Sequence, residues 1–318
     1  MILDNSAFYN SMNVTQFATH MKMKHNNGLI DFARTISSEI VKEVKAQSIL
    51  YSDFVTNSLI TSYSLGTFMA TYQRQGEMDS ADVTLHPESI KTNDKLNYDN
   101  VSDILFCVGK IYKLLMREQA SGKDYKFDYE GNLRQLTLDG VIRKIDEIIF
   151  KGTDAITNNG SAITGVYNTP YKTTIQLTDW GNATNRDLDL DIKKIQDVFV
   201  SEKIYASTRY ICYMSRGLYN MLHYEYKASS HRSIKEKLME SDIFDKIQPL
   251  DLLTGKEFLM MPINKNYVDY AQSLAPSLRY IPQTNGLSGI TGLILAIGTP
   301  RIKTTMSGQK TIIHGQVL

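Results

Sequence analysis

The sequence predicts a mixed α+β fold, and three observations carry this prediction. Some stretches have apolar residues at helical spacing, and others alternate or form the short apolar runs that are typical of strands. The two kinds of segment are interleaved along the chain, without an internal repeat or a heptad array. The chain has 318 residues, of which 42% are hydrophobic and 22% charged, so it has the composition of an ordinary folded protein.

The N-terminal part divides into a polar arm and a helix. Residues 1–30 are rich in Asn, Met, His and Lys and have weak periodicity, which predicts an extended arm ordered mainly by contacts with something else. From Leu29 to about Ala46, apolar residues share one helical face opposite a charged one, which predicts an amphipathic helix. The apolar residues are Ile36, Ile40, Val41 and Val44.

Residues 49–127 are expected to hold strands and a long polar excursion. Thr67–Tyr72 and Ile104–Val108 are predicted strands, and the polar chain between them includes the segment Gly76–Ser80. Loops of this length are uncommon in compact domains unless they are functional or stabilised by partners. A long two-stranded arm that reaches a neighbouring molecule would explain the excursion.

A long helix is the clearest single element in the sequence. It is predicted to begin as early as Asn132 and to end at Gly152, which makes it about 30 Å long. Its apolar residues form one stripe, with charged residues outside. The stripe consists of Leu138, Val141, Ile142, Ile145, Ile148 and Ile149. A turn-rich stretch, Thr153–Gly165, follows.

The remaining chain alternates between helices and strands. The predicted helices are Asp189–Phe199, Ser215–Tyr226 and Ser233–Met239. The predicted strands are Tyr210–Met214, Glu257–Met261, Leu278–Ile281, Leu293–Ile297, Arg301–Thr305 and Lys310–Ile313.

The charge balance disfavours a general nucleic-acid binder. The 35 basic and 34 acidic side chains create no overall field, and the nearest local basic patch is sparse and interrupted by Glu236. That patch consists of Lys227, Arg232, Lys235 and Lys237. Apolar runs are too short for a membrane span, and the first residues do not resemble a signal peptide. The chain is therefore expected to be made and used in the cytoplasm.

No catalytic, cofactor or metal site is predicted. The segment Gly286–Gly292 lacks the Lys-Ser/Thr of a phosphate loop, and the six histidines are scattered. The acidic alternation Asp187–Asp191 is assigned to helix capping, because the Gly and Glu of a calcium loop are missing. Ser215 lacks the preceding Gly of a nucleophile elbow and is assigned to a helix cap. Cys107 and Cys212 are expected to be free thiols that behave as small buried hydrophobes.

One short motif follows the long helix. Asp146–Gly152 combines acidic and apolar residues before a glycine, and Gly160–Pro170 continues as Gly-Ser-Ala-Ile-Thr-Gly-Val-Tyr-Asn-Thr-Pro. This pattern resembles the major capsid proteins of tailed bacteriophages with the Hong Kong 97-type fold. There, a long spine helix ends in such a segment and a later loop carries Gly-Ile-x-Gly-Leu-Leu-Asn-x-Pro. Here Val166 and Tyr167 replace the Leu pair.

The resemblance implies a division of the whole chain. Residues 1–48 would form the N-terminal arm and helix, 49–127 the extended loop and first peripheral strands, and 128–164 the spine helix and turn of the peripheral domain. Residues 165–285 would form the axial domain, and 286–318 the returning peripheral strands. The positions expected to matter for assembly lie in the loop and in the turn after the spine helix. They are Arg74, Gly76, Glu77, Asp79, Gly152, Gly165, Asn168 and Pro170.

The resemblance also implies a function without catalysis, cofactor or metal. Copies of the chain would assemble into the pentamers and hexamers of an icosahedral shell around double-stranded DNA. The shell would be built in the host cytoplasm and contact a portal, with scaffold or decoration proteins as further partners. It would have no membrane partner. Three alternatives stay open: an encapsulin-type nanocompartment shell, a soluble enzyme with an unrecognised site, and a tail or baseplate component.

Overall fold

The computed structural model describes residues 49–76, 97–115, 128–158, 161–180, 185–204, 207–223, 233–281 and 289–317. The chain divides into two compact units, each built from separated stretches. The smaller unit includes Gly109–Val141 and Ala275–Ala296, and the larger includes Gln47–Val108, Ile142–Leu274 and Ile297–Leu318. The predicted arm and the predicted helix at Leu29–Ala46 lie outside the described residues.

Helices and strands alternate as the mixed pattern predicted. The helices are α3 (Ile49–Thr56), α5 (Tyr129–Lys151), α6 (Asn185–Ser201), α7 (Arg216–Met221) and α8 (Ile234–Met239). The first strands are β1 (Ile60–Ser62), β2 (Met69–Gln75), β3 (Tyr98–Ile104), β4 (Phe106–Leu114), β5 (Gly152–Asn158), β6 (Ser161–Thr164) and β7 (Lys172–Leu177). The later strands are β8 (Tyr210–Met214), β9 (Phe244–Pro249), β10 (Glu257–Pro262), β11 (Val268–Tyr280), β12 (Ile290–Ile302) and β13 (Ile312–Val317).

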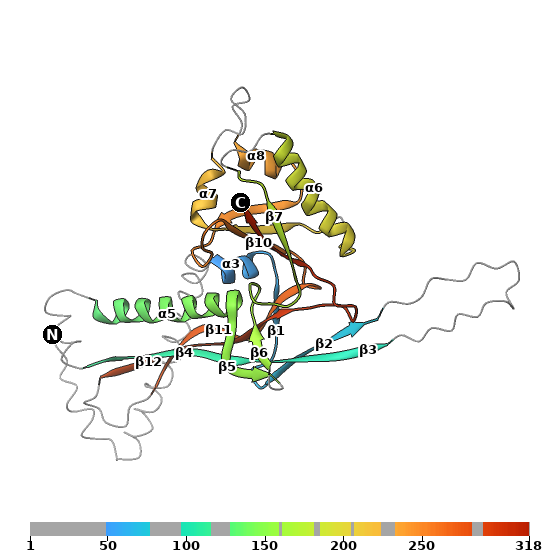
Figure 1. The fold of residues 1–318 in the computed structure, drawn as a ribbon. Helices are drawn as coiled ribbons and strands as arrows, with labels where there is room; N and C mark the ends of the chain where they lie inside the picture. The colour runs from blue at the N-terminus through green and yellow to red at the C-terminus, as the bar shows by residue number, and fades with distance from the viewer. Residues whose placement is uncertain are drawn as a thin grey trace, which may run out of the picture. The chain divides into compact units, whose positions relative to one another are not determined.

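A five-stranded sheet in the order β7-β13-β10-β8-β9 forms the centre of the larger unit. The inner strand β8 is buried at every position, so its successive side chains point into the cores on the two faces of the sheet. Tyr210, Cys212 and Met214 pack with apolar residues of α6, α7 and α8. Between them, Tyr213 donates its hydroxyl to Asp53 of α3. The three helices therefore cover one face of the sheet and α3 the other (Figure 1).

A four-stranded sheet has the order β1-β11-β12-β4, and its longer strands run through both units. In the smaller unit, Gly292 of β12 lies beneath the Tyr112 ring of β4, where an added Cβ would come within 2.3 Å of Cζ. The Tyr280 hydroxyl of β11 donates to Glu130 of α5 over 2.9 Å. The predicted stripe of α5 is buried along its whole length, which confirms the helix and its apolar face.

Two further strand pairs stand alone. Strands β2 and β3 form an antiparallel ribbon with continuous register from Met69 opposite Ile104 to Gln75 opposite Tyr98 (Figure 1). Strands β5 and β6 form a short hairpin with a register shift between Thr153 and Thr157. The stretch Thr153–Gly165 was predicted to be rich in turns, whereas most of it is paired as strands.

Other differences from the predicted elements have local causes. Residues 49–56, placed in a strand-rich region, form helix α3, whose buried Leu50 and Phe54 are held by tertiary packing. Two predicted strands merge into β12, because Gly298 continues the strand where the Tyr270 ring fills the space of a side chain. The predicted strand at Ile104–Val108 instead spans the junction of β3 and β4.

Candidate functional site

The motif after the long helix caps the C-terminus of that helix. The backbone amides of Val166 and Tyr167 donate to the carbonyls of Ile149 and Phe150 over 2.9 and 2.8 Å. The side-chain amide of Asn168 donates to the next carbonyl, that of Lys151, over 2.9 Å. The last carbonyls of a helix have no partner within the helix, and here the motif supplies one for each of these three.

Two glycines make this cap possible. Gly152 ends α5 with φ +83°, and a Cβ there would lie 1.9 Å from the Ile163 carbonyl oxygen. At Gly165 a Cβ would lie 2.5 Å from the Phe150 carbonyl oxygen. The structure thus brings together Gly152, Gly165 and Asn168 of the predicted set, and exposed Pro170 follows the cap. Both glycines are required by the close backbone approach.

The cap is connected to the five-stranded sheet through Tyr167. Its ring lies 4.8 Å from the ring of Phe150 and 4.9 Å from that of His314 on β13. Its hydroxyl donates to Glu257 of β10 over 3.3 Å, and Lys172 lies over the ring at 4.7 Å. Burial, then the nearby Lys172 charge, hold the pKa of His314 below its usual value.

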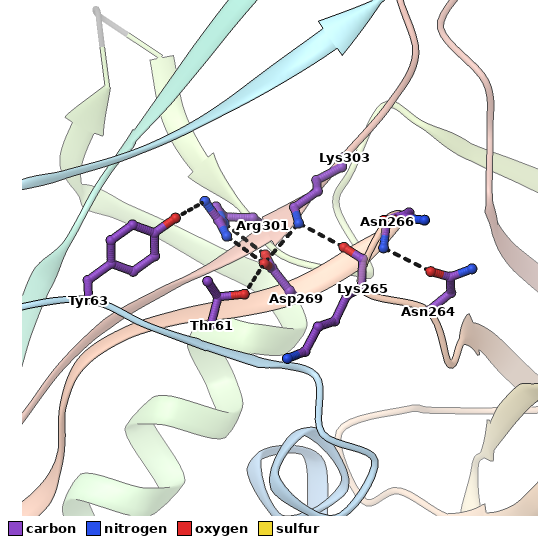
Figure 2. A network of polar contacts seen from close by, with 8 residues as sticks. All are labelled: Thr61, Tyr63, Asn264, Lys265, Asn266, Asp269, Arg301 and Lys303. Atoms are coloured by element: carbon purple, nitrogen blue, oxygen red, sulfur yellow. Dashed lines mark hydrogen bonds and ion pairs between the residues drawn. The ribbon is translucent and has the colours of Figure 1, made fainter.

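A buried ion-pair cluster joins β1, β11 and the C-terminal end of β12 (Figure 2). Asp269 is fully buried and receives the Arg301 guanidinium through two nitrogens, one at 2.8 Å. Lys303 lies 2.9 Å from the same carboxylate, and the Thr61 hydroxyl donates to it over 2.7 Å. Burial alone would raise the pKa of Asp269, but the hydrogen bonds from Arg301 and Lys303 hold it below the usual value.

The same cations reach the β2–β3 ribbon. The Tyr72 ring of β2 lies 5.9 Å from the Arg301 guanidinium and 5.9 Å from the Lys303 ammonium. Burial raises the pKa of Tyr72 to about 12, so the ring stays neutral at physiological pH. Cations over a tyrosine face are attracted to it, more strongly where water is excluded. The ion-pair cluster therefore fixes the base of the ribbon.

The predicted loop residues lie at the outer part of this ribbon. Arg74 of β2 pairs with Asp99, directly opposite on β3, and the Gly76 amide donates to the Asn97 carbonyl over 3.0 Å. Arg74 is therefore a ribbon residue and not part of an irregular loop. Glu77 and Asp79 lie outside the described residues, so their predicted role in assembly stays a prediction.

Two buried carboxylates, Asp53 and Asp191, also organise the larger unit. Asp53 of α3 accepts from the Tyr213 hydroxyl over 2.8 Å, from Lys246 over 3.0 Å and from Gln248. Asp191 accepts from the Trp180 indole over 3.1 Å and from Thr178. Asp191 lies inside α6, so the assignment of Asp187–Asp191 to capping is wrong for this residue. Asp53 had no sequence signal, because its partners are distant in the chain.

The structure also bears on the predictions for Ser215 and for the two cysteines. Ser215 caps α7, with the Leu218 amide donating to its hydroxyl over 3.4 Å, as predicted. Cys107 and Cys212 are both free thiols, but only Cys212 is buried. The described residues contain no group of three or more His, Cys, Asp or Glu side chains that could hold a metal ion. Within the same stretches, none of the helices has the length and apolar character that crossing a membrane requires.

The sequence matches one protein family along most of its length. The family of unknown function DUF6260 matches residues 31–315. The chain belongs to this family. No curated protein sequence matches this DUF6260 chain.

Several solved structures similar to the DUF6260 chain are described as capsids or as a virus-like particle. A virus-like particle from Pyrococcus furiosus matches with a TM-score of 0.59 at 12% identity, over 90% of this chain and 99% of that one. The capsid of Myoviridae phage XM1 matches with a TM-score of 0.56 at 13% identity, over 83% of this chain and 91% of that one. The capsid of a native GTA particle matches with a TM-score of 0.58 at 12% identity, over 85% and 92%. The DUF6260 chain therefore has the Hong Kong 97-type capsid fold that the motif after the long helix and the order of the elements indicated.

Proposed function

We propose that this chain is a major capsid protein, which self-assembles into a closed shell. The observation that carries the proposal is the extent of the fold match. Three shell proteins each align over 90% or more of their own length with most of this chain, so the likeness is not limited to a shared subdomain. At 10–13% identity the match establishes the fold, and the step from fold to shell is the proposal.

Two local features support this assignment. A two-stranded ribbon has few neighbours of its own and is marginally stable alone, yet its base is anchored by a buried ion-pair cluster. Anchoring of this kind holds a protruding element in one direction, as contact with a neighbouring subunit requires. The near-neutral charge, formally +1, also limits repulsion among many copies in one shell.

The finer parts of the proposal follow from the same assignment. Subunits form pentamers and hexamers of an icosahedral bacteriophage head, and the shell encloses double-stranded DNA through non-specific contacts. Assembly takes place in the host cytoplasm, and the product is part of the virion. A portal, and scaffold or decoration proteins, are the further partners. The chain acts as a structural protein and catalyses no reaction. Within it, the segments 1–48, 49–127, 128–164, 165–285 and 286–318 take the arm, loop, peripheral, axial and returning-strand roles.

An encapsulin-type nanocompartment is the second candidate, because such shells share the fold but enclose a cargo enzyme. The match to a virus-like particle over 99% of its chain is the observation that favours it. The two candidates differ in what fills the particle and in whether one vertex carries a portal.

Purification of the full chain tests the proposal directly. Size-exclusion chromatography and electron microscopy should show closed particles of uniform size. A stable monomer or small oligomer at high concentration would contradict a shell function. Particles isolated from the native source, treated with nuclease and then opened, should release protected DNA if the shell is a phage head. Particles that release a co-purifying enzyme and no DNA would favour the nanocompartment.

A further inference from the structure

Tyr167 is held against the five-stranded sheet by polar contacts on two sides. Its hydroxyl donates to the Glu257 carboxylate of β10 over 3.3 Å. Its backbone carbonyl accepts from the Lys172 ammonium at the start of β7 over 2.6 Å, and the same ammonium lies over its ring. The Tyr167 amide donates to the Phe150 carbonyl of α5, so these contacts tie the end of that helix to the sheet.

His314 lies beside Tyr167 and is placed to compete with it for Glu257. The imidazole and the Tyr167 ring are 4.9 Å apart, edge to face. The imidazole Nε2 atom is buried and has no hydrogen-bond partner among the residues that the structure describes. It lies 3.9 Å from Oε2 of Glu257, the same oxygen that accepts from the Tyr167 hydroxyl. That accepted bond is longer than the roughly 2.5–3.0 Å that is usual between two oxygens. One carboxylate oxygen therefore lies between two donors, and neither holds it at close range.

Protonation of His314 changes the balance between these two donors. A charged N–H binds a carboxylate about twice as strongly as a neutral hydroxyl does. The proton also places a second cation beside the ring over which Lys172 already lies, and like charges repel at this range. Burial, then the Lys172 charge, lower the pKa of His314, whereas Glu257 raises it. The imidazole is therefore neutral at pH 7 and takes up its proton in acidic solution.

The polar groups that face His314 come from β7, β10 and the cap. They are Lys172, Glu257 and the Tyr167 hydroxyl. The residues that pair with His314 in the sheet are Leu259 of β10 and Thr174 of β7, which carry no charge. The charge on His314 therefore acts mainly on one carboxylate and one ammonium, and both of these groups hold Tyr167.

We propose that His314 is a proton-operated switch of the α5 cap. On protonation, the imidazolium draws the Glu257 carboxylate away from the Tyr167 hydroxyl and repels Lys172 from the Tyr167 carbonyl. Both contacts that hold Tyr167 against the sheet are then weakened, and the cap of α5 opens more often. Only side chains need to move, because Nε2 and Oε2 are already 3.9 Å apart. The switch is a property of one chain and does not depend on the proposed shell function.

Hydrogen exchange of the cap amides measures the switch in the full chain. The Val166 and Tyr167 amides are bonded to carbonyls of α5, so their protection factor, corrected for the intrinsic effect of pH, reports opening of the cap. Between pH 7 and pH 5 we expect this protection to fall by about fivefold or more. The amides of strand β8 should keep their protection. An equal loss in β8 would mean that acid unfolds the larger unit as a whole, and would overturn a local switch.

Three variants separate the switch from other effects of acid. His314→Gln cannot take up the proton, and Glu257→Gln has no carboxylate for an imidazolium to draw. Each should reduce the loss of cap protection to less than about twofold. His223→Gln is the matched control and should keep the full loss, since His223 is exposed and also lies edge to face with a tyrosine, at 5.4 Å.

The full loss of protection in His314→Gln or in Glu257→Gln would overturn the switch. So would constant protection of the cap in the unsubstituted chain, a result that does not depend on how well any variant folds. Closed particles can form in either case, so the proposed function stands or falls separately.

Discussion

At the scale of single residues, the larger unit depends on carboxylates buried among cations and hydroxyls. Asp269 is the most enclosed of these and joins strands that are far apart in the sequence. Its pairing with Arg301 could not be predicted, because neither residue belongs to a recognisable motif. Each is an isolated charge in a strand-forming segment, and only the folded sheet brings the two together.

Removal of the Asp269 charge should destabilise the protein strongly. Asp269→Asn leaves the buried Arg301 guanidinium without its ionic partner, which typically costs about 3–5 kcal/mol. Urea denaturation followed by circular dichroism measures the change. The matched control is Asp251→Asn, because Asp251 also binds an arginine through two nitrogens, but at an exposed site. That change should cost less than about 1 kcal/mol, and a similar loss for both variants would contradict this view of the cluster.

His314 predicts a pH dependence of stability. Its pKa is lowered by burial and by Lys172, so the unfolded chain binds its proton more readily than the folded chain. Stability is therefore fully present above the unfolded value of about 6.5 and is lost as pH falls through the folded pKa. The groups that face the imidazole are Lys172, Glu257 and the ring of Tyr167. His314→Gln should flatten the stability profile between pH 7 and 5, and an unchanged slope would assign the acid sensitivity elsewhere.

At the scale of elements, the sequence predicted what local pattern determines. Helix α5 was predicted from its apolar stripe, and α8 was predicted at Ser233–Met239, where Ser233 forms a capping box with Glu236. Helix α3 and strands β7 and β9 were missed, because short elements with mixed composition are specified by packing rather than by their own periodicity. The cap of α5 was recognised as a motif, but its purpose became visible only when the backbone contacts of Gly152 and Gly165 were known.

Gly152 should be the least replaceable residue of the cap. Gly152→Ala places a side chain at φ +83° and within 1.9 Å of a carbonyl oxygen, so the helix end must move. Gly255→Ala is the control, since Gly255 has φ +65° but open space around it. The control should cost about 1–2 kcal/mol and Gly152→Ala clearly more, or the variant should fail to fold. Equal losses in urea denaturation would show that backbone conformation, and not close approach, makes Gly152 necessary.

At the scale of the whole molecule, the order of elements was more informative than any one of them. The mixed class was predicted from that order, and the Hong Kong 97-type fold from that order together with the motif after the long helix, although identity to similar solved structures is only 10–13%. The division into five segments stays a prediction. The described chain forms two units whose boundaries cut through β4, α5, β11 and β12, because long elements contribute to both. A division into consecutive segments cannot describe elements that contribute residues to both units.

If the excursion between β2 and β3 is shortened, the chain should still fold but should no longer assemble. Residues Gly76 and Asn97 are joined by a backbone hydrogen bond, so a short turn can replace the chain from Gly76 to Asn97 without disturbing Arg74 and Asp99. The variant should remain soluble and folded but form no closed particles. Circular dichroism and electron microscopy measure the two properties. Normal shells from this variant would show that assembly does not require the excursion.

The ion-pair cluster at the base of the ribbon has a mechanical consequence. Strands β2 and β3 are held at the point where the Tyr72 ring lies against the cations of Arg301 and Lys303. A sideways force on the ribbon must move the Tyr72 ring away from two cations, and both of these cations form ion pairs with Asp269. These contacts therefore oppose bending of the ribbon at Tyr72. In the proposed shell, this contact would hold the direction in which the ribbon reaches a neighbouring copy.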